Sequence, residues 1–160
     1  MTFRTLMLAA AALAAPLAIA APAQADGGVY VSVEGEKIAV SGYDPVSYFK
    51  GDGKPVKGDA RYSTQYNGAE WRFASQENLE AFEANPEAYA PQYGGHCAWA
   101  MSRGYLAPGD ATLYKIVDGK LYLNFNRQVQ DTWLGNIAGF ISKANIAWID
   151  IPTGKVFGQG

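Results

Sequence analysis

The stretch YNGAEWRFAS, residues 66–75, decides the local fold of the first half of the chain. Its Asn67-Gly68 pair tolerates the positive φ angles that a two-residue hairpin turn needs at both central positions. The segments on either side, residues 61–66 and 69–73, are therefore predicted to pair as antiparallel strands. Ser75 is a residue type that favours a helix N-cap, so a short helix is predicted to follow the hairpin.

A second hairpin is predicted where Asp118-Gly119 separates residues 113–117 from residues 121–125. A long helix is predicted from Arg127 to Trp148, because large apolar side chains recur there at intervals of three and four. These elements predict an α+β fold with a small antiparallel sheet built from the two hairpins. The short helix and the long C-terminal amphipathic helix are expected to pack against this sheet. No internal repeat is expected beyond the hairpins.

The first 25 residues have the pattern of a secretory signal peptide. Arg4 supplies a positive charge, residues 6–21 are apolar apart from one proline, and Ala-Gln-Ala at 23–25 fits a cleavage site. We therefore expect a protein exported to the periplasm or secreted, with residues 26–160 forming a single domain that has no membrane span. An extended segment is predicted over residues 28–40.

Composition narrows the classes of function. The formal net charge of −2 disfavours nucleic acid as a partner, because neutralisation of phosphates dominates such binding. The chain contains one cysteine and one histidine, so it has no internal disulfide and little material for a catalytic constellation. We expect no enzymatic activity.

The order of three motifs resembles the YHS-domain family. The motifs are GYDPV at residues 42–46, the stretch at residues 66–75, and the run from Phe82 to Tyr89. The similarity covers about residues 38–101 and is closest to the exported bacterial YHS-domain-containing proteins. Cysteine-bearing members resemble treble-clef-like metal binders, but their cysteine positions correspond here to Ser47, Ala74 and Asn78. The resemblance therefore implies the fold without that metal site.

Soft-ligand chemistry is confined to one stretch, residues 93–101. It contains His96, Cys97 and Met101, whose imidazole, thiol and thioether are suitable ligands for copper(I). These three residues are the predicted metal site, with copper as the candidate cofactor. Two alternatives remain at this point: Cys97 is a buried structural thiol, or it is a reactive thiol activated by its neighbour.

A recognition domain without metal is the alternative function. In this interpretation Cys97 is structural, and aromatic and proline side chains near the glycines form a pocket for a small ligand or a protein partner. The candidate residues are Tyr89, Pro91, Tyr93, Trp99 and Tyr105. Exposure of two or more of them in one concavity would support this function.

Overall fold

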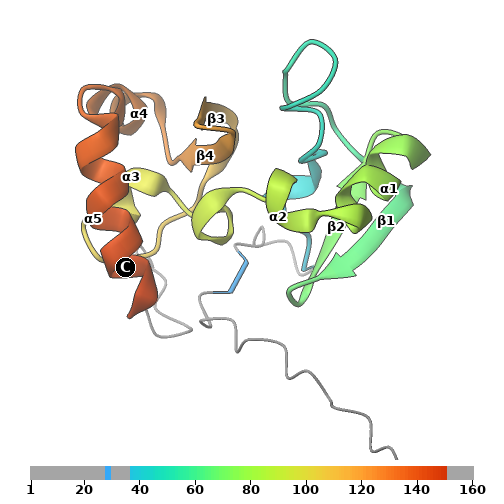
Figure 1. Cartoon of the computed structure of the whole chain (residues 1–160), viewed down its shortest axis with the longest axis horizontal. Coiled ribbons are helices and arrows are strands. Elements are labelled where there is room, and N and C mark those ends of the chain that lie inside the picture. The colour runs from blue at the N-terminus through green and yellow to red at the C-terminus, as the bar shows by residue number, and fades with distance from the viewer. Residues whose placement is uncertain (1–27, 30–36, 151–160) are drawn as a thin grey trace, which may run out of the picture.

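The computed structural model describes residues 28–29 and 37–150, which form two lobes (Figure 1). Residues 37–89 form one lobe and residues 92–149 the other. The predicted signal peptide and most of the predicted extended segment 28–40 lie outside the described residues. Within the described part of the chain, every helix is too short or too polar to cross a membrane.

The first lobe is built around the hairpin predicted from the Asn67-Gly68 turn. Its elements are η1 (Val40–Gly42), β1 (Asp59–Tyr66), β2 (Ala69–Phe73), α1 (Gln76–Ala84) and α2 (Pro86–Tyr89). Tyr66 pairs with Ala69 across the turn, so the predicted register is confirmed. The Ser75 hydroxyl accepts the amide of Asn78 at 3.2 Å, which confirms the predicted N-cap of α1.

The second lobe contains the other hairpin and the C-terminal helices. Its elements are η2 (Gln92–Gly95), α3 (Ala98–Met101), β3 (Asp110–Val117), β4 (Lys120–Asn124), α4 (Arg127–Leu134) and α5 (Ile137–Ile149). The α+β class is confirmed, but the hairpins form two separate two-stranded sheets and do not share one. The prediction of one long helix is wrong, because the chain leaves the helix at Gly135-Asn136. The Asn136 side chain accepts the amide of Gly139 at 3.2 Å and starts a new helix.

The second lobe repeats the order of elements of the first with one addition, the short helix α3 between η2 and β3, so the expectation of no repeat beyond the hairpins is wrong. Each lobe has a 3-10 turn before its hairpin, and each hairpin has a register shift just after its first residue, Asp59 or Asp110. Both hairpin turns have positive φ angles at their two central residues. Both following helices start at a side-chain N-cap, Ser75 or Asn126, and a second helix follows each of them.

The segments that precede the hairpins correspond as well. Residues 40–42 and 93–95 all have positive φ angles, in one lobe and then the other. Two residues after each triplet, the amides of Asp44 and Cys97 donate to a carbonyl oxygen of the following loop, at 2.8 and 2.9 Å. Position 97 of the second lobe is therefore the counterpart of position 44 in the first.

Each lobe has a core in which a strand aromatic meets a helix aromatic. In the first lobe Trp71 stacks on Phe82 with ring centroids 5.1 Å apart, and Phe73 contacts the same ring. In the second, Tyr122 and Trp133 form the corresponding pair at 5.6 Å. Burying rings of this size contributes roughly 1.5–3 kcal/mol each to folding, which makes the two pairs central to stability.

Two tyrosines join the lobes. The Tyr48 hydroxyl donates to the carbonyl oxygen of Ala111 at 2.7 Å, and the Tyr114 hydroxyl donates to the carbonyl oxygen of Gly53 at 2.8 Å. Their rings meet edge to face with centroids 4.9 Å apart. Each lobe thus supplies one donor and one acceptor to the junction.

The Asp44 carboxylate fastens the corner where β2 turns into α1. The side chain is fully buried and accepts hydrogen bonds from the amides of Val46 and Ala74, at 2.8 and 2.9 Å. It also accepts the side-chain amide of Asn78 at 2.7 Å. Ser47 lies beside it, with its hydroxyl donating to the Asp44 carbonyl oxygen. The three positions expected to carry the family's cysteines therefore gather around a carboxylate.

We expect Asp44→Ala to lower the free energy of unfolding by about 3 kcal/mol, because it leaves the buried amide of Val46 and the partly buried donors of Ala74 and Asn78 without an acceptor. Urea-induced unfolding monitored by tryptophan fluorescence measures the change. Asp52→Ala removes a carboxylate from the exposed loop and serves as the matched control, with little expected effect. Equal stabilities of the two variants would contradict this role of Asp44.

Candidate functional site

His96 is held by main-chain carbonyl groups. Its side chain is 7 % exposed, and Nε2 lies 3.0 Å from the carbonyl oxygen of Gly28. The carbonyl of Ala107 also hydrogen-bonds the ring. Burial lowers the pKa of His96, and these two carbonyl groups oppose the shift. The ring is therefore neutral and oriented by backbone contacts on both sides of the segment.

Cys97 lies directly before α3 with its side chain fully buried. Its Sγ is 3.9 Å from Oδ1 of Asn124, at the end of β4. The backbone amides of Ala100, Phe125 and Trp99 hydrogen-bond the sulfur, yet burial outweighs them and raises the pKa of the thiol. A neutral, enclosed thiol is the opposite of the exposed, low-pKa cysteine that characterises a nucleophile.

Met101 lies one helical turn beyond Cys97, and its amide donates to the Cys97 carbonyl oxygen at 3.0 Å. The thioether is buried in the second lobe's core with Trp133, whereas Cys97 packs with Ala100 and Ala107 in a separate cluster. Over residues 28–29 and 37–150, no group of three or more His, Cys, Asp or Glu side chains is placed to hold a metal ion. The predicted site at His96, Cys97 and Met101 stays a prediction.

The predicted aromatic residues divide between two environments. Pro91 and Tyr93 line a cleft, whereas Tyr89 packs edge to face on Phe49 at 5.6 Å. Trp99 and Tyr105 contact each other at 6.5 Å on a different part of the second lobe. Tyr93, which is buried, is thus the one named aromatic residue that lines the cleft, so the criterion of two exposed aromatics in one concavity is not met, and the cleft is formed mostly by other residues.

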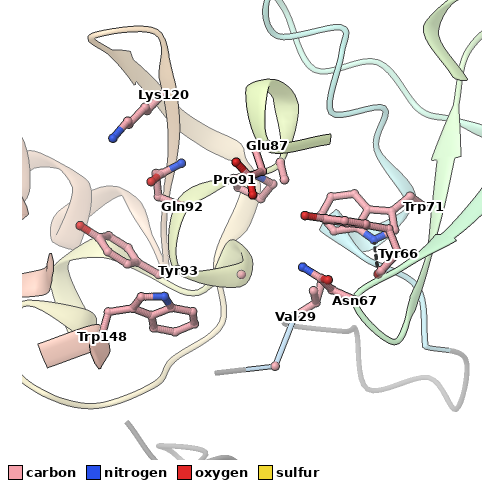
Figure 2. A pocket seen from close by; sticks show the side chains of 13 residues that line it. Val29, Tyr66, Asn67, Trp71, Glu87, Pro91, Gln92, Tyr93, Lys120 and Trp148 are labelled. Atoms are coloured by element: carbon pink, nitrogen blue, oxygen red, sulfur yellow. Dashed lines mark hydrogen bonds between the residues drawn. The ribbon is translucent and has the colours of Figure 1, made fainter. Parts of the chain in front are cut away.

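This cleft lies between the two lobes and has a volume of about 550 Å³ (Figure 2). Tyr66 and Trp71 of the first lobe stand on one side, and Tyr93 and Trp148 of the second stand on the other. Trp71 Nε1 donates to the Tyr66 carbonyl oxygen at 2.9 Å, which fixes the indole plane. Tyr93 is fixed by its hydroxyl, which donates to Asn145 Oδ1 at 2.8 Å. The first-lobe wall is therefore held by a hydrogen bond between two of its own residues, and Tyr93 of the second wall is held by a residue of α5.

Polar side chains surround these aromatic walls. Glu87 and Lys120 bring one charge of each sign to the lining, and Asn67 and Gln92 add side-chain amides. Sequence reasoning missed most of this set, because Tyr66, Lys120 and Trp148 are far apart in the chain. The only signal in the sequence was the concentration of aromatic residues around residues 89–99.

Comparison with known families identifies one match. Residues 46–93 match the YHS domain, which confirms the resemblance seen in the sequence; the match covers most of the first lobe and ends within η2. No curated protein and no solved structure matches the chain.

Acidification is expected to destabilise the wild-type protein more than His96→Gln. Because burial lowers the pKa of His96 in the folded state, the unfolded state binds the proton first. Stability is therefore lost as the pH falls from about 6.5, the ordinary histidine pKa, with a slope of up to about 1.4 kcal/mol per pH unit. Urea unfolding of both proteins between pH 8 and pH 5 measures this difference.

The control is internal, since the chain has one histidine and its carboxylates are common to both proteins. Above pH 7.5 the difference in stability between the two proteins should be constant. Parallel stability curves through the acidic window would show that His96 titrates equally in the folded and unfolded states.

Proposed function

We propose that this chain, which carries a YHS domain over residues 46–93, is an exported, non-catalytic binding protein. It holds a small planar organic ligand in the cleft between its lobes. The observation that carries this proposal is the convergence of four aromatic side chains from both lobes on one cleft. Export rests on the signal-peptide pattern of residues 1–25.

The volume and lining of the cleft support a small ligand. A space of about 550 Å³ lies within the range of cofactor and metabolite sites, which are mostly apolar with a few polar groups that orient the ligand. Tyr66 and Trp148 are half-buried, so their rings offer a surface to a ligand while the core holds their positions. A planar ligand can stack on such rings, and each good aromatic contact adds about 0.5–1.5 kcal/mol beyond simple burial.

The polar lining favours a ligand with both donors and acceptors at its edge. Lys120 and Glu87 are exposed residues of the cleft, so a zwitterionic or amide-bearing ring would find a complement for each of its groups. A strongly anionic or cationic ligand would meet one repulsive partner. The environments of His96 and Cys97 support a binding role over catalysis, since the thiol is neutral and enclosed.

Trp148→Ala is expected to abolish binding of small aromatic probes to the protein. Indole, benzamide and benzylamine serve as probes, and saturation-transfer NMR detects which of them contact the protein. Removing the indole of Trp148 takes away one wall of the cleft, and we expect the transfer signal to fall at least about tenfold, in line with the loss of one or two aromatic contacts.

Phe125→Ala is the matched control, because Phe125 is a half-exposed aromatic residue outside the cleft. It should leave the signal unchanged. Equal signals from wild-type protein and Trp148→Ala, or loss of signal in Phe125→Ala alone, would count against the cleft as the binding site.

Copper handling is the second candidate function, and one observation favours it. Cys97 and Met101 lie one helical turn apart with both sulfurs buried, which suits a soft cation that must be kept from water. Binding would require the His96 ring to release the Gly28 carbonyl oxygen. The energy of metal coordination would have to offset that loss.

This second candidate predicts that Cys97→Ser weakens copper(I) binding at least about tenfold, because the thiolate is the strongest of the three ligands. Competition with a chromogenic copper(I) chelator under anaerobic conditions measures the affinity. Ser102→Ala, which alters a neighbouring hydroxyl, provides the control. If Cys97→Ser and wild type compete equally, the metal site at His96, Cys97 and Met101 is excluded.

A further inference from the structure

The internal repeat gives Cys97 an unexpected counterpart. Cys97 occupies in the second lobe the position that Asp44 occupies in the first, at the corner between hairpin and helix. The Asp44 side chain accepts three hydrogen bonds. The second lobe thus has the same arrangement of backbone donors around this position, but the side chain there is a thiol.

The donors of that corner are still present around Cys97. The amides of Ala100, Phe125 and Trp99 hydrogen-bond the sulfur. Two of these donors have counterparts in the first lobe, since Trp99 and Phe125 correspond to Val46 and Ala74, whose amides bind Asp44. A thiol is a weak acceptor, so the three backbone donors are directed at a group that cannot satisfy them well.

The side-chain amide that faces the sulfur also has an unused donor. Asn124 is fully buried, and its Oδ1 is 3.9 Å from Cys97 Sγ. The Nδ2 atom of the same amide has no hydrogen-bond partner among the described residues. A buried amide donor left in this way costs about 1–3 kcal/mol, so the corner lacks an acceptor that the thiol does not provide. In the first lobe the Asn78 side-chain amide plays this role for Asp44.

We propose that Cys97 is an oxidation site, at which a peroxide converts the thiol to a sulfinate that the amides around it bind as those of the first lobe bind Asp44. A cysteine sulfinate carries two oxygens and one negative charge on the atom next to Cβ, as an aspartate does. The two sulfinate oxygens then accept hydrogen bonds from the backbone amides of Trp99 and Phe125. The side-chain amide of Asn124 supplies a further donor once it has rotated by half a turn.

The chemistry takes two equivalents of hydrogen peroxide. In each step the sulfur attacks one peroxide oxygen, the O–O bond breaks, and the other oxygen leaves as water with the displaced proton. The first step oxidises the thiol to a sulfenic acid, and the second oxidises this to a sulfinic acid, which loses its proton. The sulfenic acid has no second cysteine in the chain to condense with, so oxidation continues to the sulfinate.

The burial of Cys97 sets the rate of this reaction. Peroxide reaches the sulfur only when the corner opens locally, because the side chain is fully buried. Oxidation is therefore expected over hours in excess peroxide. Once formed, the sulfinate is held by the donors and stabilises the closed corner.

The test uses the full chain, treated with excess hydrogen peroxide in the presence of a chelator and analysed by peptide mass spectrometry. We expect Cys97 to gain two oxygen atoms in most molecules, with fragment ions separating it from Met101. Thermal unfolding of the treated protein should show a midpoint at or above that of untreated protein. A Cys97 that remains a thiol, or whose oxidation to sulfinate lowers the midpoint, would overturn the proposal.

Two isosteric variants test the corner without oxidant. Cys97→Asp places a carboxylate where the sulfinate would be, whereas Cys97→Asn places a donor against the amides of Trp99 and Phe125. We expect Cys97→Asp to unfold several degrees above Cys97→Asn at pH 8. The reverse order would contradict an anion-holding corner, and the peroxide experiment decides the matter if neither variant folds.

Discussion

The buried Asp44 carboxylate is the constraint on which the first lobe depends. A buried carboxyl group is costly unless hydrogen-bond donors surround it, and here two backbone amides and the Asn78 side chain supply them. These donors come from the turn after Asp44, the end of β2 and the first turn of α1. One side chain therefore fixes the relative positions of three segments, and the aromatic core of Trp71 and Phe82 assembles behind them.

The two lobes show how one corner can be closed by different chemistry. Their sequences agree mainly where the backbone leaves no choice, as at Gly58-Asp59-Ala60 and Gly109-Asp110-Ala111. A side chain at Gly58 would collide with the backbone of Arg72, and one at Gly109 would collide with that of Gly95. Corresponding core residues differ between the lobes, because packing constrains the size of a side chain more than its identity. The repeat is therefore evident in the structure and obscure in the sequence.

Local features were predictable from the sequence, and long-range ones were not. The Asn67-Gly68 hairpin and the Ser75 cap depend on neighbouring residues, so their patterns carried the information. The break at Asn136 was missed because the apolar periodicity continues across it, although asparagine is itself a strong cap. The cleft could not be foreseen, since its walls come from Tyr66 and Trp148, whose proximity depends on how the lobes meet.

The tyrosine junction bears on how the molecule unfolds. Tyr48 and Tyr114 each reach from their own lobe to a carbonyl oxygen of the other, so separating the lobes breaks both hydrogen bonds together. In each half, a loop carbonyl oxygen accepts its hydrogen bond from a tyrosine hydroxyl of the other half, so each loop is expected to lose this contact when the halves separate. Ala111, Leu121 and Leu123 of the second lobe also pack in the same cluster as the core of the first, so the two halves are expected to unfold as one cooperative unit.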